Sequence, residues 1–128
     1  GARASQVAEE LFKANRYDDY LHFHGLAVES AEALAELWHK RVRHELNIGA
    51  ADSPTIEHLF MQSYQGSRYS FGYPACPRLE DQARLLELLD AARVGVALSD
   101  EYQLVPEQST SALVAHHPEA RYFSIVGG

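Results

Sequence analysis

Residues 66 to 77 read Gly-Ser-Arg-Tyr-Ser-Phe-Gly-Tyr-Pro-Ala-Cys-Pro, and this run is the most informative part of the chain. Pro74 and Pro77 each fix their own φ angle, lack a backbone N–H and favour extended geometry in the residue before them. This composition suits neither a helix nor a central strand. We therefore predict a stiff loop with partly free backbone carbonyls, and with one cation, Arg68, placed four residues before Gly72.

Length and composition indicate one domain with one core, because 128 residues with 46% hydrophobic and 23% charged side chains are ordinary for a globular protein. The net charge of −7 and the scattered basic residues argue against nucleic acid as a partner. A single cysteine is typical of a reducing, cytoplasmic location. No apolar run approaches the ~20 residues of a membrane helix, and the polar N-terminal residues do not resemble a signal peptide, so no membrane partner is expected.

Apolar periodicity predicts several helices. The first covers residues 4–14, and a longer one covers about 18–46, with a possible interruption near Gly25. Ser53 and Pro54 suggest the N-cap and first position of a short helix that continues through Phe60. A further helix is predicted over residues 79–93, with Gly95 as its stop.

The last third of the chain contains short β-branched or aromatic runs separated by turn residues, at 94–98, 102–105, 111–116 and 122–126. The last two runs are close enough in sequence to form an antiparallel pair. Because helices come first and strands later, the fold class is predicted to be α+β rather than a doubly wound parallel sheet. Residues 1–128 are expected to form a single domain without repeats or linkers.

The motif Arg68-x-x-x-Gly72-Tyr-Pro-Ala-Cys-Pro77 resembles the signature of the S-adenosylmethionine-binding activation domain of cobalamin-dependent methionine synthase. The likeness extends over nearly the whole chain, through segments such as 17–20, 34–43, 64–66, 106–112 and 117–123. It implies N-terminal helices followed by a bent antiparallel sheet. It also implies binding of S-adenosylmethionine, whose methyl group restores methylcobalamin after accidental oxidation to cob(II)alamin. The cobalamin would be held by a partner domain of the same enzyme, and flavodoxin or a flavoprotein reductase would supply the electron.

The resemblance also implies which residues form the binding site. Arg68 is expected to bind the ligand carboxylate bidentately, and Gly72 lets the ligand approach the backbone. Tyrosine rings offer faces for adenine or for a cation, and loop carbonyls face the sulfonium and ammonium groups. Glu32 aligns with a helical carboxylate near the ligand, although a solvated acid on a polar face is an equal alternative. The full expected set is Arg68, Tyr69, Gly72, Tyr73, Pro74, Ala75, Tyr122, Phe123 and Glu32. The alternative for the loop itself is an ordinary proline-rich turn with Arg68 on the surface.

Two departures from the family pattern stand out. Phe123 replaces a tyrosine often found at that position, which removes a hydroxyl but not a stacking surface. An upstream segment, whose aspartate holds the ligand ammonium in the family, has no counterpart here, so the chain is expected to be a partial version of the domain or a short separate subunit.

Other chemistry is less well supported by the residues. The seven histidines are poorly spaced for joint metal binding, and Cys76 stands between prolines with no histidine adjacent, so neither a zinc site nor a cysteine nucleophile is expected. No catalytic residue and no metal bound by this chain are predicted. Two functions stay open: a module that supports methyl transfer to cobalt, and a module that senses S-adenosylmethionine or docks a cobalamin domain without turnover of its own.

Overall fold

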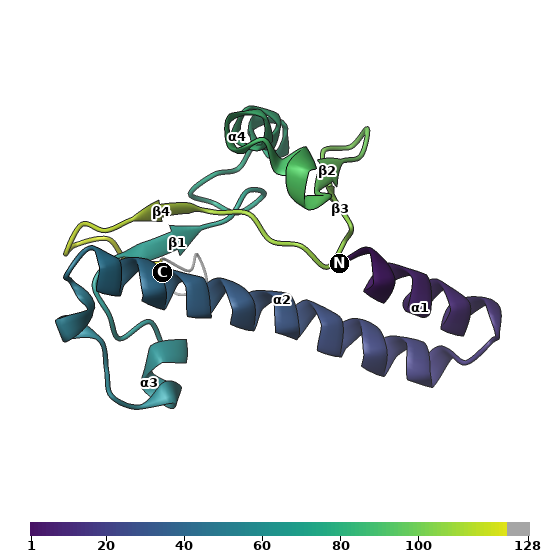
Figure 1. The fold of residues 1–128 in the computed structure, drawn as a ribbon, viewed down its shortest axis with the longest axis horizontal. Coiled ribbons are helices and arrows are strands. Elements are labelled where there is room, and N and C mark those ends of the chain that lie inside the picture. Colours follow the sequence, from purple (N-terminus) through teal and green to yellow (C-terminus); the bar gives the residue numbers. More distant parts are fainter. Residues whose placement is uncertain (123–128) are drawn as a thin grey trace. The chain divides into compact units, whose positions relative to one another are not determined.

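Helix α2, Tyr17–Glu45, runs without a break through 29 residues and links two compact units of the chain. The computed structural model describes residues 1–122. The first unit contains residues 1–33 and 78–111, and the second contains residues 34–77 and those from 112 onward. The possible interruption at Gly25 does not occur, because one glycine costs a helix interior only about 1 kcal/mol and the chain has no proline there. Figure 1 shows α2 as the long helix of the fold.

In the first unit, α1 (Ala2–Lys13) is followed by a turn in which Asn15 takes a left-handed φ of 58°. The ring of Phe12 packs edge-on against Tyr17 and Tyr20, both at 5.4 Å between centroids, which joins α1 to the start of α2. The helix predicted over residues 4–14 is thus confirmed. A buried Gln108 accepts a hydrogen bond of 2.8 Å from the Ser5 hydroxyl.

The helix predicted over 79–93 is divided into three pieces in the structure. A short 3₁₀ turn η2 (Leu79–Asp81) leads into α4 (Gln82–Leu89), and a second 3₁₀ turn η3 (Ala91–Val94) follows. The prediction of one helix was wrong because Asp90 adopts a left-handed φ of 49°, which closes α4. Gly95, at φ 73°, is the stop that was predicted. The strands β2 (Ala97–Leu98) and β3 (Leu104–Val105) then form a short antiparallel pair.

The second unit is built around the last part of α2. It adds a 3₁₀ turn η1 (Gly49–Ala51), the helix α3 (Ile56–Phe60), and the strands β1 (Ser67–Tyr69) and β4 (Leu113–Ala115). The two strands pair antiparallel, with Arg68 opposite Val114. Figure 1 shows this pair beside the end of α2. Its buried residues include Leu59, Tyr64 and a fully buried Ser67.

Two local predictions are corrected in this unit, and a third is not tested. The short helix begins at Ile56 with Thr55 before it, not at Pro54, because the Ser53 hydroxyl accepts the Thr55 N–H in a local turn. The predicted loop starts with a strand, since residues 67–69 precede the first proline and are free to pair. The run at 111–116 pairs with β1, and its predicted pairing with 122–126 stays a prediction because residues 123–126 lie outside the described part of the chain.

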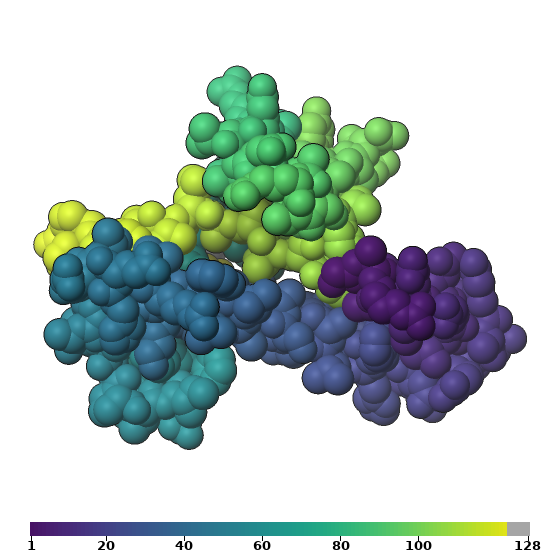
Figure 2. Space-filling model, viewed as in Figure 1, coloured from purple at the N-terminus to yellow at the C-terminus, as the bar shows by residue number. Residues whose placement is uncertain are grey.

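The predicted α+β class, with helices before antiparallel strands, is confirmed. None of the helices in residues 1–122 offers an apolar stretch that would reach across a membrane. Much of the last part of α2 lies at the surface (Figure 2), and large apolar side chains on it are exposed, including Leu34, Leu37 and Trp38.

Candidate functional site

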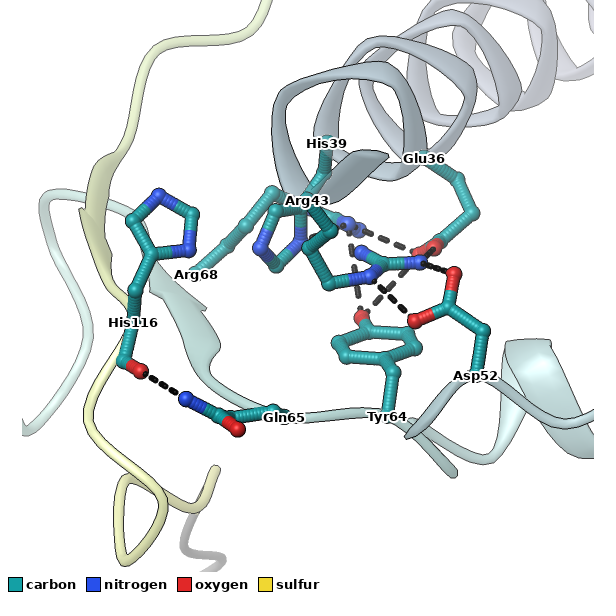
Figure 3. Close-up of polar contacts among 8 residues, drawn as sticks. All are labelled: Glu36, His39, Arg43, Asp52, Tyr64, Gln65, Arg68 and His116. Atoms are coloured by element: carbon teal, nitrogen blue, oxygen red, sulfur yellow. Dashed lines mark hydrogen bonds and ion pairs between the residues drawn. The ribbon is translucent and has the colours of Figure 1, made fainter. Parts of the chain in front are cut away.

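Arg68 occupies the middle of β1, and its side chain reaches α2 (Figure 3). Within residues 1–122, one guanidinium nitrogen, Nη1, makes all of its side-chain hydrogen bonds. It donates to Glu36 Oε2 at 2.7 Å and to His39 Nδ1 at 3.1 Å, and it lies 3.5 Å from the Tyr64 hydroxyl. Because Glu36 is mostly buried and Arg68 is 20% exposed at its side chain, this is a partly desolvated ion pair that water does not screen fully.

A second arginine belongs to the same cluster of charged side chains. Arg43 is fully buried and holds Asp52 with a two-pronged contact, Nε to Oδ1 at 2.8 Å and Nη2 to Oδ2 at 2.9 Å. Its guanidinium lies 3.7 Å from the centre of the Tyr64 ring, a close cation–π contact. The Tyr64 hydroxyl in turn donates to Glu36 Oε2 at 3.2 Å (Figure 3). Two guanidinium cations therefore lie beside two carboxylates, and each buried charge has a partner.

The electrostatics of this cluster keep His39 neutral. Burial is the main cause that lowers the pKa of His39 to about 4, and the nearby cations Arg43 and Arg68 add to it. Since an arginine can only donate hydrogen bonds, His39 Nδ1 must accept, which places the proton of the neutral ring on Nε2. Burial, followed by the charge of Glu36, raises the pKa of Tyr64. Tyr64 therefore stays protonated, and its hydroxyl can donate a hydrogen bond to Glu36.

The rest of the motif surrounds a small pocket in the same unit. Strand alternation turns Tyr69 to the face of β1 opposite to Arg68. The Tyr69 hydroxyl donates to the Arg121 carbonyl at 2.9 Å. The pocket is partly open to solvent. It is lined by Tyr69, Ser70, Tyr73, Pro74, Ala75 and Tyr122.

The motif loop is closed by its own backbone. The Gly72 N–H donates to the Cys76 carbonyl at 2.8 Å, and the Cys76 N–H donates to the Tyr73 carbonyl at 2.9 Å. Gly72 has a φ of 85°, a conformation that side chains rarely adopt, so the glycine of the motif is required by the turn. The rigid loop that the prolines predicted is therefore a hydrogen-bonded turn that presents Tyr73 and Pro74 at the pocket.

The structure thus divides the predicted site residues into groups. Five of them, Tyr69, Tyr73, Pro74, Ala75 and Tyr122, line one pocket, while Arg68 faces α2. Glu32 is exposed on α2 within the first unit, and Phe123 lies outside the described residues. Their common role in one ligand site stays a prediction.

Sequence reasoning missed Glu36, His39 and Tyr64 as neighbours of Arg68. A usable signal was present, because Glu36, His39 and Arg43 are spaced i, i+3 and i+7 and therefore share one face of α2. Within residues 1–122, no group of three or more His, Cys, Asp or Glu side chains is placed to hold a metal ion.

Comparison with known proteins gives consistent matches over almost the entire chain. The family model described as "Vitamin B12 dependent methionine synthase, activation domain" matches residues 1–127. The chain is 50% identical over 131 residues to methionine synthase of Mycobacterium tuberculosis (strain ATCC 25618 / H37Rv). It is 51% identical over 131 residues to methionine synthase of Mycobacterium leprae (strain TN). Each match covers 98% of this chain, which spans only 11% of the length of either relative.

A solved structure has the same fold. The crystal structure of the MetH reactivation domain bound to AdoHcy superimposes with a TM-score of 0.86 at 31% sequence identity. The match covers 97% of this chain and 39% of the other.

Proposed function

Because this chain belongs to the family of vitamin B12-dependent methionine synthase activation domains, we propose that it binds S-adenosylmethionine and supports reductive methylation of cob(II)alamin. The observation that carries the proposal is the folded motif, in which a partly exposed Arg68 and a tyrosine-lined pocket lie on one short strand and its following turn. The solved relative was crystallised with AdoHcy, the product that remains when S-adenosylmethionine gives up its methyl group.

The contribution of this chain would be binding and orientation. Arg68 offers a planar cation to the carboxylate of the ligand. Tyr73 and Tyr122 offer aromatic faces to the adenine or the sulfonium, and the loop backbone offers carbonyl oxygens. The cobalamin of a partner domain supplies the nucleophile, so no general base is required from this chain, and the work left to the protein is positioning and electrostatics.

The partners follow from the same proposal. The cobalamin domain would belong to the same methionine synthase, and flavodoxin or a flavoprotein reductase would donate the electron that reduces cob(II)alamin before the methyl group is transferred. The site would comprise Arg68, Tyr69, Gly72, Tyr73, Pro74, Ala75, Tyr122, Phe123 and Glu32, and the protein would act in the cytoplasm as one domain spanning residues 1–128.

Titration calorimetry with S-adenosylhomocysteine tests the binding part of the proposal. Arg68→Ala should weaken binding by roughly 2–5 kcal/mol, much of it from leaving a charge unpaired. Arg68→Lys should also weaken binding, because a point charge does not replace a planar fork. Arg84→Ala, at an exposed arginine of α4, is the matched control and should bind as wild type does. Wild-type affinity in both Arg68 variants would remove Arg68 from the site, and absence of binding by the wild-type protein together with its upstream segment would overturn the proposal.

Absorption spectroscopy separates a supporting role in methyl transfer from a sensing or docking role. The protein is mixed with a cob(II)alamin-loaded partner domain, a reductant and S-adenosylmethionine. Appearance of the methylcobalamin spectrum, dependent on this chain, is expected. Tight ligand binding without any change at cobalt would instead favour a module that senses the ligand or docks the cobalamin domain.

A further inference from the structure

Among residues 1–122, Arg68 is held through one guanidinium nitrogen. Its Nη1 contacts Glu36, His39 and Tyr64, and neither Nε nor Nη2 donates a hydrogen bond to another residue of this part of the chain. The Arg68 side chain is 20% exposed, so it is not sealed off from solvent. One corner of the guanidinium is therefore fixed, and the Nε–Nη2 edge has no partner among the described residues.

The contact of Arg43 with Asp52 shows how the Nε–Nη2 edge of an arginine binds a carboxylate. It uses the same two atoms, Nε and Nη2, to hold both oxygens of Asp52 at 2.8 and 2.9 Å. The guanidinium is rigid and planar, so a contact that fixes Nη1 also fixes the direction of the Nε–Nη2 edge. Arg68 thus presents the same pair of atoms, Nε and Nη2, with which Arg43 binds the carboxylate of Asp52.

The groups that hold Nη1 are themselves constrained. Tyr64 is buried, has Arg43 stacked on its ring and donates its hydroxyl to Glu36. Glu36 lies on α2 with its side chain only 14% exposed, and its second oxygen is 3.8 Å from Arg43 Nη2. His39 is 3% exposed and accepts from Nη1 through Nδ1. Neither Glu36 nor Asp52 occupies the Nε–Nη2 edge of Arg68.

We propose that Glu36, His39 and Tyr64 are positioning residues, which hold Arg68 through Nη1 so that its Nε–Nη2 edge remains available for the carboxylate of the ligand. The proposal rests on the function proposed above. The three side chains do not touch the ligand, and they act by removing rotational freedom from the guanidinium before binding, which lowers the entropic cost of binding.

Two variants of equal charge and similar size isolate this role. Glu36→Gln keeps an oxygen that can accept from Nη1, whereas Glu36→Leu removes it, and both remove the same negative charge. Affinity is measured by calorimetry for S-adenosylhomocysteine and, by competition, for 5′-methylthioadenosine, which lacks the carboxylate. Glu36→Leu should bind S-adenosylhomocysteine about tenfold more weakly than Glu36→Gln, as expected for loss of a hydrogen bond to a charged group. Their affinities for 5′-methylthioadenosine should be equal.

Tyr64→Phe serves as a milder test in case Glu36→Leu does not fold. It keeps the ring beneath Arg43 and removes only the hydroxyl, and it should weaken S-adenosylhomocysteine binding by about twofold to tenfold without affecting 5′-methylthioadenosine. Equal S-adenosylhomocysteine affinity of folded Glu36→Leu and Glu36→Gln, wild-type affinity in Tyr64→Phe, or parallel losses for both ligands would overturn the positioning role while leaving the proposed function intact. A wild-type protein that binds no S-adenosylhomocysteine even together with its upstream segment would overturn both.

Discussion

At the scale of single residues, the second unit depends on a histidine that must remain uncharged. His39 lies among two arginines and a second histidine, His116, whose ring centre is 5.7 Å away. Its desolvation and these neighbours disfavour a positive charge, so its Nδ1 lone pair stays available to Arg68. A protonated ring would lose this acceptor and would place a third cation beside Arg43 and Arg68.

The stability of the protein should therefore fall as the solution becomes acidic. The pKa of His39 in the folded protein is about 4, below its ordinary value of 6.5, so its contribution is fully present above pH 6.5 and is lost as the pH falls towards 4. Between pH 7.5 and 5 this should amount to about 1–2 kcal/mol of unfolding free energy. Urea unfolding at both pH values measures it.

His39→Asn provides the comparison for this prediction, because asparagine can accept at the position of Nδ1 but does not titrate. Wild type should lose about 1–2 kcal/mol more unfolding free energy between pH 7.5 and 5 than His39→Asn loses. His22→Asn, at an exposed position of α2, should retain the wild-type pH dependence. An equal pH dependence in wild type and His39→Asn would contradict the assignment.

At the scale of elements, the pairing of β1 with β4 sets the position of Arg68. The approach to β1 is made by Gly66, which has a φ of 96°. A Cβ atom at Gly66 would lie 2.6 Å from the Ala115 carbonyl oxygen of β4, a distance that side-chain carbons essentially never show. The neighbouring Gln65 donates its Nε2–H to the His116 carbonyl at 2.8 Å, so the two segments also meet just before β1 begins and just after β4 ends.

The same substitution at two glycines should have opposite effects on stability. Gly66→Ala should cost roughly 2 kcal/mol or more, because it strains the backbone and collides with a backbone oxygen. Gly25→Ala, within α2 and with nothing within 4 Å of the new Cβ, should stabilise by about 0.5–1 kcal/mol. Thermal or urea unfolding measures both. If Gly66→Ala were as stable as wild type, the close approach of β1 and β4 described above would be wrong.

At the scale of the whole molecule, the expected ligand-binding residues are distributed unequally. Arg68, the motif turn and Tyr122 belong to the second unit, and Glu32 is the only described member of the expected set in the first. Ligand binding stabilises the folded form of whatever region forms the site, by about 2.7 kcal/mol at a ligand concentration of 100 times Kd.

Hydrogen exchange should reveal this asymmetry. S-adenosylhomocysteine should slow amide exchange in β1, in residues 70–76 and in β4, and should leave α1 and the β2–β3 pair unchanged. Additional protection of α2 around Glu32 would support the inclusion of that carboxylate in the site. Protection confined to the first unit would contradict the placement of the ligand in the second.

The sequence by itself determined the order of the elements, the α+β class and the family. These follow from apolar periodicity, from the proline and glycine positions of residues 66–77, and from a motif specific enough to recognise. Such signals are local, because they reflect the backbone preferences of neighbouring residues. They also predicted five residues, Tyr69, Tyr73, Pro74, Ala75 and Tyr122, that the fold gathers around one pocket.

Only the tertiary structure decided which side chains meet Arg68 and which strand pairs with which. Strand β4 pairs with β1 across 43 or more intervening residues, and Glu36 meets Arg68 across 32 positions, so neither contact leaves a short-range pattern. The start of α3 at Ile56 was missed because the Ser53 hydroxyl accepts the Thr55 N–H in a local turn. The left-handed turn at Asp90 was missed because aspartate is one of the few residues that adopt this conformation, and the apolar pattern does not reveal it. A buried cluster of charged groups is stable only when all its members are in contact with one another. Only the folded chain brings these groups together.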